Sequence, residues 1–213
     1  MLSIVNKIPN ILTISRIILA PIFFILFIYD YYYLALACFF LASITDFLDG
    51  FLARKFNIVS KFGQLYDPLA DKILIFLGWL CIIIKPPFSQ EMLDSREFDA
   101  LLSIHLSGLL NIDPNHIIFF ILVILLFRDL IATTLREEKF KKDRIILKTN
   151  YMAKIKTTIL VICIHLYLLY QLIPENSYQE YVLLSFDYSL YLTLLASLVS
   201  LFNYINQYKD KRI

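Results

Sequence analysis

Four aspartates at helical spacings are the residues of this sequence best suited to chemistry. Asp46 and Asp49 lie three positions apart, and Asp67 and Asp71 lie four positions apart. In a helix, residues three or four apart share one face, so each pair would present its carboxylates together. If the short connection at 55–63 folds the helix with Asp67 and Asp71 back against the helix with Asp46 and Asp49, the two acid faces can meet across a cleft. Four carboxylates without a nitrogen or sulfur ligand favour two hard divalent cations, Mg²⁺ or Mn²⁺, which can bridge a pyrophosphate.

A simpler interpretation exists for each of these residues taken singly. An acid at a helix end can simply be solvated, and a single Asp near Arg54 or Lys72 would be interpreted in that way. The small residues beside the acids could serve tight helix packing. Four acids in register need another reason, because charges at the membrane end of a helix cost several kcal/mol unless they are paired, hydrated or bound to metal. Asp67 followed by Pro68 also predicts a helix start, with the acid as cap and proline at the first helical position.

The composition indicates that the helices carrying these acids lie in lipid. Hydrophobic residues make up 59% of the chain and charged residues 18%, against roughly 45–50% and about 25% in soluble domains. A helix needs about 20 apolar residues to cross a bilayer. The sequence predicts an all-α protein, a bundle of six transmembrane helices in one domain covering residues 1–213, with spans near 11–29, 33–53, 68–85, 115–135, 156–173 and 187–206.

The distribution of basic residues predicts the orientation of this bundle. All Lys and Arg residues except Lys85 and Arg96 fall on the side of the two termini. Basic loops face the cytoplasm, so both termini and the acids should face the cytoplasm from the inner membrane. Residues 86–114 form a long outer segment, which either lies on the membrane surface or packs over the outer ends of the bundle. The three isolated cysteines are expected to be packing residues, and no nucleic-acid partner is expected.

The acids belong to a longer pattern, D-x2-D-G-x2-A-R-x8-G-x3-D-x3-D. Its eight fixed positions are filled by Asp46, Asp49, Gly50, Ala53, Arg54, Gly63, Asp67 and Asp71. The complete pattern resembles that of the CDP-alcohol phosphotransferase family. This resemblance implies a six-helix membrane bundle, usually a homodimer, with an active site open to the cytoplasm.

The resemblance also implies a role for each position. Asp46, Asp49 and Asp67 would be metal ligands, and Asp71 would be both a ligand and the general base. An alcohol is a poor nucleophile at neutral pH, so a positioned carboxylate that takes its proton fits the reaction. The residues expected to bind the CDP part of the donor are Asn10, Thr13, Asp49, Gly50, Ala53, Arg54, Ser60 and Gly63.

Motifs outside the central pattern resemble the phosphatidylglycerophosphate synthase branch of this family. They include the entry to the first helix at 10–16, the stretch 67–72, and the residues at 135–137 and 154–158. The substrates would then be CDP-diacylglycerol and glycerol 3-phosphate, with membrane lipid around the protein. Because the acceptor is a small dianion, its pocket should be basic. The candidates are Arg16, Arg128, Arg136, Lys154 and Lys156, although basic residues on this side would exist for topology alone.

Two alternatives stay open at this point. A sibling enzyme could use serine, inositol phosphate or phosphatidylglycerol as the acceptor, because Asp129 and Ala153 depart from the residues expected in the synthase branch. A transporter or cation channel could instead line an ion path with the four acids. That function predicts polar residues at mid-membrane depth along several helices, whereas the stretches 115–127 and 157–173 are nearly bare of charge.

Overall fold

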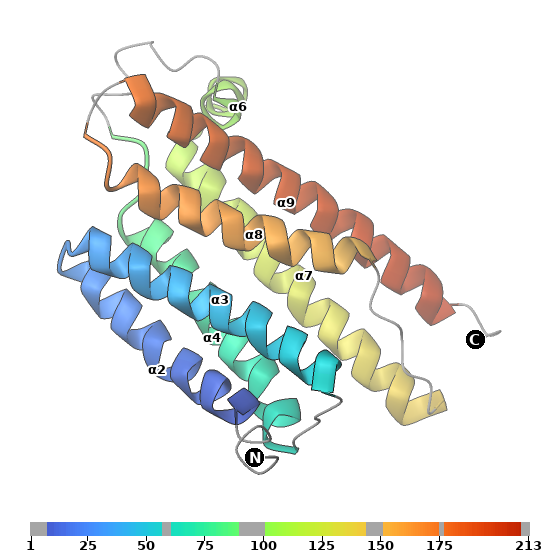
Figure 1. The fold of residues 1–213 in the computed structure, drawn as a ribbon. Coiled ribbons are helices and arrows are strands. Elements are labelled where there is room, and N and C mark those ends of the chain that lie inside the picture. Colours follow the sequence, from blue (N-terminus) through green and yellow to red (C-terminus); the bar gives the residue numbers. More distant parts are fainter. Residues whose placement is uncertain (1–7, 57–60, 90–100, 144–150, 175–176, 210–213) are drawn as a thin grey trace. The chain divides into compact units, whose positions relative to one another are not determined.

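The computed structural model describes residues 8–56, 61–89, 101–143, 151–174 and 177–209, and within these ranges the regular structure is helical throughout (Figure 1). This confirms the expected all-α class. The helices are α2 (Ile8–Ile28), α3 (Tyr32–Phe56), α4 (Lys61–Ile84), α6 (Leu102–Leu110), α7 (Pro114–Asp143), α8 (Tyr151–Tyr170) and α9 (Ser177–Lys209). They form two compact units. The first contains α2, α3, α4 and the end of α8, and the second contains α6, α7, α9 and the rest of α8.

Four of the described helices, α2, α7, α8 and α9, are long and apolar enough to cross a membrane. The apolar part of α3, Tyr32–Asp46, is shorter than a membrane span requires. The first half of α4 carries four charged residues, Lys61, Asp67, Asp71 and Lys72. The protein is therefore an integral membrane protein by length and composition of its helices, and six crossings with cytoplasmic termini stay a prediction.

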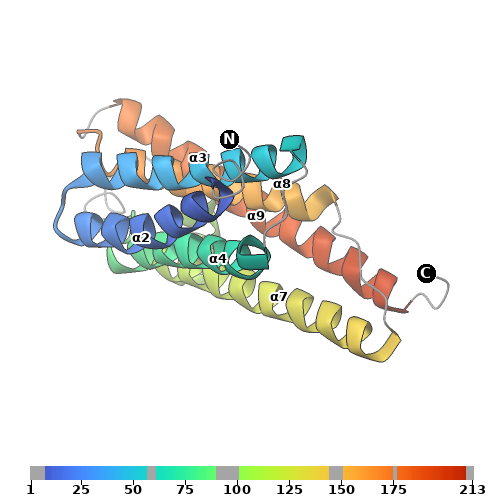
Figure 2. The same cartoon turned by 60° about the horizontal axis from the view of Figure 1, so that its bottom comes forward.

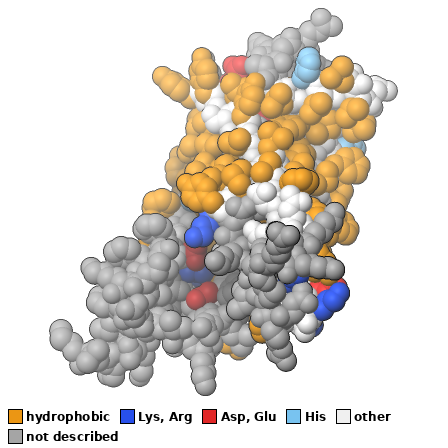
Figure 3. Space-filling view, turned by 90° about the vertical axis from the view of Figure 1, so that its right-hand side faces the viewer, with side chains coloured by type: hydrophobic (Ala, Val, Ile, Leu, Met, Phe, Trp, Pro, Cys, Tyr) orange, Lys and Arg blue, Asp and Glu red, His pale blue; other side chains and the backbone are white. Residues whose placement is uncertain are grey.

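The α2 helix shows how the sequence separates its two faces. Exposed isoleucines recur on one face every three or four residues: Ile11, Ile14, Ile18, Ile22 and Ile25. The opposite face is buried and contains Thr13 and Arg16 near its start and aromatic residues further along. In a membrane the exposed apolar face suits lipid and the polar residues turn inward. Figure 3 shows such hydrophobic side chains over much of one described surface.

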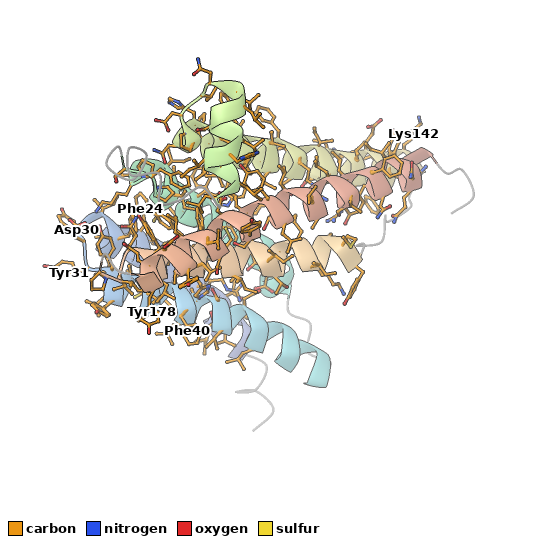
Figure 4. The ribbon with its side chains drawn as sticks, turned by 90° about the horizontal axis from the view of Figure 1, so that it is seen from above. Phe24, Asp30, Tyr31, Phe40, Lys142 and Tyr178 are labelled. Atoms are coloured by element: carbon orange, nitrogen blue, oxygen red, sulfur yellow. The ribbon has the colours of Figure 1, made fainter. Side chains whose placement is uncertain are left out.

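In the first unit, α2 packs against both α3 and α4 (Figures 1 and 2). The turn between α2 and α3 is closed by Asp30, whose φ of 64° is the left-handed conformation that ends many helices. The Tyr31 amide donates to the Leu26 carbonyl at 2.9 Å, as in a Schellman motif. Asp30 and Tyr31 lie at the tip of this hairpin (Figure 4).

In the second unit, α7 begins where the sequence supplies a cap and a proline. The Asp113 carboxylate accepts a hydrogen bond from the Asn115 amide at 2.7 Å, and Pro114 is the first helical residue. Long helices follow, with Lys142 near the end of α7 and Tyr178 at the start of α9 (Figure 4).

The stretch 86–114 contains one described helix, α6, which packs against α7 and α9. The Ser103 hydroxyl and amide both donate to the buried carboxylate of Asp187 on α9. The sequence placed the start of the last span near residue 187, whereas α9 begins at Ser177 and carries Asp187 within the helix. A run of apolar residues in the sequence ends at a carboxylate. The helix itself can continue through that residue when a partner such as Ser103 donates hydrogen bonds to the carboxylate.

A second correction concerns the start of α4. Asp67 and Pro68 were expected to begin the helix, but α4 begins at Lys61 and runs through both residues. The four-residue steps from Gly63 through Asp67 to Asp71 already required one continuous helix for a shared face. Pro68 therefore lies inside the helix although proline favours a first turn. Asp67 does not cap the helix start and instead accepts a hydrogen bond from Thr13 of α2.

Candidate active site

The centre of the candidate site in the first unit is Arg16, a fully buried residue of α2. Its Nη1 atom lies 2.6 Å from Asp71 Oδ1 and 3.0 Å from Asp46 Oδ1. Asp46 comes from α3 and Asp71 from α4, so one guanidinium nitrogen joins the two helices that carry the acid pairs. The two acid faces therefore meet at Asp46 and Asp71, as the spacing predicted.

The third described acid, Asp67, is held by Thr13. The Thr13 hydroxyl, which is fully buried, donates to Asp67 Oδ1 at 2.5 Å. Thr13 and Arg16 are three residues apart on α2, so they face the same way and reach two acids one turn apart on α4. Thr13 was expected among the donor-binding residues, and its described contact is with a predicted metal ligand.

The other predicted donor-binding positions are described less fully. Asn10 lies in the first turn of α2. Ser60 lies outside the described residues. The remaining positions lie on described helix backbone with side chains outside the described set: Asp49, Gly50, Ala53 and Arg54 on α3, and Gly63 on α4. Their roles stay predictions.

The described acids suit a hard cation because their donor atoms are oxygens and because solvent reaches them. Asp46 and Asp71 are 53% and 44% exposed at their side chains, so solvent reaches carboxylates that already converge on one positive charge. Among the side chains that the structure describes, no three His, Cys, Asp or Glu residues form a metal-binding group. Asp49, the fourth predicted ligand, is outside that set. All available donors are oxygens, which suits Mg²⁺ or Mn²⁺.

The second unit contains a cluster of cations around one acid. Lys156 of α8 contacts Asp129 of α7 through both carboxylate oxygens, at 2.6 and 2.8 Å. Arg128 Nη1 contacts the same carboxylate at 2.9 Å, and Arg128 Nε donates to the Ser197 carbonyl of α9. Arg128 and Lys156 are buried, whereas Asp129 is about a third exposed. Two of the predicted acceptor-binding cations are thus brought together.

Arg136 extends this cluster along α7 and α9. Its guanidinium donates to the buried Tyr204 hydroxyl and stacks over the Tyr204 ring at 4.6 Å from the centroid. Arg128 lies over the same ring at 5.9 Å. Lys154, the other predicted acceptor-binding residue of α8, is exposed. Arg16 is in the first unit, against the acids.

Several buried donors in this second cluster have no hydrogen-bond partner in the described structure. They are Arg128 Nη2, Arg136 Nε and the hydroxyls of Ser197 and Ser200. Unpaired buried donors are costly, so a group of them indicates a place for an acceptor-rich ligand. Sequence reasoning missed the two serines and Tyr204. Their signal was the spacing 197, 200 and 204, which places them on one face of α9.

Comparison with known proteins gives a family and several relatives. The model of the CDP-alcohol phosphatidyltransferase family matches residues 6–200. A Rickettsia typhi protein named CDP-diacylglycerol–glycerol-3-phosphate 3-phosphatidyltransferase is 46% identical over 113 residues, covering 46% of this chain and 64% of its own length. A Cereibacter sphaeroides protein of the same name is 33% identical over 162 residues, covering 74% of this chain and 61% of its own length.

A third relative has a different name. A Schizosaccharomyces pombe fusion protein, named cardiolipin synthase (CMP-forming) and mitochondrial hydrolase, is 49% identical over 78 residues, which is 36% of this chain and 13% of that protein. The chain thus spans less than two thirds of the length of each of these curated relatives.

Proposed function

Because the chain belongs to the CDP-alcohol phosphatidyltransferase family, we propose that it transfers a phosphatidyl group from CDP-diacylglycerol to glycerol 3-phosphate and releases CMP. The observation that carries this proposal is the convergence of Asp46 and Asp71, from two different helices, on one buried cation. The names of the Rickettsia and Cereibacter relatives support the choice of donor and acceptor.

In this proposal the acids Asp46, Asp49, Asp67 and Asp71 hold two divalent cations, Mg²⁺ or Mn²⁺. When bound, these cations supply charge neutralisation at the pyrophosphate of the donor. The half-exposed Asp71 carboxylate accepts the proton of the acceptor hydroxyl as that oxygen attacks phosphorus. Thr13 keeps Asp67 turned toward α2, and so fixes the orientation of one ligand before substrates arrive.

The CDP part of the donor is proposed to lie along α3 and the start of α4. Gly50, Ala53 and Gly63 are small enough for a nucleotide to approach the helices, and Arg54 supplies a planar pair of donors for phosphate. Asn10, Asp49 and Ser60 would complete this part of the site.

The acceptor phosphate is proposed to bind the cluster of cations in the second unit. Arg128, Arg136 and Lys156 exceed the single negative charge of Asp129, and a phosphate monoester is a dianion with several acceptor oxygens. The unpaired donors at Arg128, Arg136, Ser197 and Ser200 support this assignment. Lys154, which is exposed, would contribute through its charge.

The wider setting of the enzyme is also a proposal. We propose a single family domain with six membrane crossings, cytoplasmic termini and an active site facing the cytoplasm from the inner membrane. The four helices that are long and apolar enough to cross support it, as does the bias of basic residues. A homodimer is proposed from the family resemblance.

A second candidate within the family is transfer to phosphatidylglycerol, which the name of the Schizosaccharomyces relative favours. Serine or inositol phosphate as acceptor, and cation transport, have no comparable support. Buried unpaired donors for a phosphate favour a phosphorylated acceptor over serine.

The test is CMP release from CDP-diacylglycerol by the full-length protein in detergent, measured with each acceptor in turn. We expect release only with glycerol 3-phosphate and only with Mg²⁺ or Mn²⁺. The matched control is the Asp71→Asn variant under the same conditions, whose CMP release should be at least about 10²-fold lower with any acceptor. Release from wild-type protein that does not depend on glycerol 3-phosphate would reject this acceptor.

A further inference from the structure

We propose that Arg16 is a positioning residue that competes with divalent cations for Asp46 and Asp71, and thereby holds the acid site together while weakening its affinity for metal. This inference rests on the proposed function in taking those two carboxylates as metal ligands. The sequence suggested that Arg16 binds the acceptor phosphate. The contacts of Arg16 in the structure are instead the basis for the role proposed here.

The geometry of Arg16 is that of a cation shared between two ligands. A single nitrogen, Nη1, lies within hydrogen-bond distance of Oδ1 of Asp71 and Oδ1 of Asp46. Guanidinium pairs with carboxylates are often bidentate, with two nitrogens on one carboxylate. Here one nitrogen instead contacts two carboxylates, so two oxygens that could be offered to a metal cation are already engaged by one positive charge.

The other nitrogens of the Arg16 guanidinium make no described hydrogen bond. Its Nε and Nη2 atoms are buried and have no hydrogen-bond partner in the described structure, and the residue is 0% exposed. A buried charge must be compensated. The compensation described for Arg16 comes from the two acids, so any cation that takes these oxygens must displace Arg16 or share them with it.

The charges decide the direction of the effect. Without Arg16, two carboxylates would face each other and repel, so the metal-free protein would be less stable. A divalent cation relieves that repulsion, and without Arg16 it would also escape repulsion from a nearby positive charge. Removing the Arg16 charge should therefore strengthen metal binding, while it weakens the protein in the absence of metal.

The experiment measures Mn²⁺ alone, with full-length protein in detergent after EDTA treatment and without either substrate. Free Mn²⁺ is followed by electron paramagnetic resonance, and Tm is measured with EDTA and with saturating Mn²⁺. For Arg16→Gln we expect the Kd for Mn²⁺ to fall by about tenfold. We also expect its Tm to lie below the wild-type value in EDTA and to approach that value in Mn²⁺.

Two further variants keep the test decisive. Lys72→Gln removes an exposed positive charge next to Asp71 in sequence, without the shared contact, and should change the Kd by less than about twofold. Arg16→Lys retains the charge but replaces the planar guanidinium with a flexible ammonium, and should bind Mn²⁺ about threefold more tightly than wild type. If Arg16→Gln does not fold in EDTA, Arg16→Lys gives the answer.

An unchanged or weaker Mn²⁺ affinity in both Arg16 variants overturns the proposal, as does a wild-type protein that binds no Mn²⁺. A raised KM for glycerol 3-phosphate with unchanged Mn²⁺ affinity would instead assign Arg16 to the acceptor and also overturns it. The proposed function fails separately, through absent CMP release by wild-type protein that does bind Mn²⁺.

Discussion

The two charged clusters of this protein are opposites of one another. In the first unit a single buried cation, Arg16, lies between two acids, Asp46 and Asp71. In the second unit a single acid, Asp129, lies between two buried cations, Arg128 and Lys156. In each cluster the central residue has the opposite charge to its neighbours, and it neutralises only part of their charge.

The difference lies in which charge is left over. The first cluster has an excess of carboxylates, and Asp67 on the same helix adds to it, so the ligand that completes it is a cation. The second has an excess of cations, and its unpaired donors face no acceptor, so the ligand that completes it is an anion. A pyrophosphate-activated donor with metal ions suits the first cluster, and a phosphorylated alcohol suits the second.

The largest expected effect comes from removing the proposed base of the first cluster. Asp71→Asn keeps the shape of the side chain but cannot take a proton, and general-base catalysis contributes about 10²–10⁴-fold to a rate. We expect CMP release to fall within that range or further, with much of the affinity for CDP-diacylglycerol retained. Asp49→Asn should weaken Mn²⁺ and donor binding together. Equal loss of donor binding in the two variants would break the assigned division of roles.

The second prediction tests whether the clusters behave as opposites. Asp129→Asn removes the internal anion that competes with an incoming phosphate, as Arg16→Gln removes the internal cation that competes with metal. We expect the KM for glycerol 3-phosphate to fall by about tenfold, while Tm falls because Arg128 and Lys156 lose their shared partner. The KM comes from CMP release at varied acceptor concentrations. A higher KM would mean that Asp129 orients these cations for the acceptor instead of competing with it.

The third prediction uses the unpaired serines. Ser200→Ala and Ser197→Ala each delete a buried hydroxyl that has no partner in the described structure, so Tm should stay constant or rise slightly. If the hydroxyls bind the acceptor, KM for glycerol 3-phosphate should rise about threefold to tenfold in each variant. Thr193→Val is the matched control, because its hydroxyl already bonds to Ser189 of its own helix. A rise of KM in the control equal to that in the serine variants would argue against a direct contact.

Much of the fold could be predicted because it depends on local properties of the chain. Apolar runs and the positions of Pro114 and Asp113 specify where helices lie and begin. The starts of α4 and α9 could not be predicted in the same way. Pro68 favours a first turn locally, and Asp187 ends an apolar run, but contacts with residues distant in sequence, Thr13 to Asp67 and Ser103 to Asp187, accommodate both acids within helices.

The candidate site also has a part that local sequence predicts and a part that depends on contacts between distant residues. The spacing of Asp46 and Asp71 predicted that their faces would meet, because helical periodicity is regular and the connection between the helices is short. It could not predict that Arg16 would sit between them, since a basic residue in the first helix suits a phosphate, a lipid headgroup or an acid equally well. The serines of α9 were overlooked because a hydroxyl acquires chemical meaning only when its neighbours leave it unpaired.

The smallest expected effect concerns an ion pair outside both clusters. Lys85 contacts Asp30 at the tip of the first hairpin, where Asp30 is exposed. The hydrogen bond from Lys85, with a second from Tyr32, lowers the pKa of the Asp30 carboxyl from its ordinary value of 3.8. The contribution of this pair to stability is therefore complete at neutral pH, and it is lost only as the pH falls through that lowered pKa.

At pH 7, Asp30→Asn should lower Tm only slightly, and the difference from wild type should shrink further in high salt, because exposed pairs are screened. Thermal unfolding of both proteins at low and high salt measures this. If Asp30→Asn lowers Tm as much as Asp129→Asn does, burial would not be what distinguishes the two clusters from an ordinary surface ion pair. A negligible loss sharpens the comparison, because the same charges then matter only where a helix interface removes them from water.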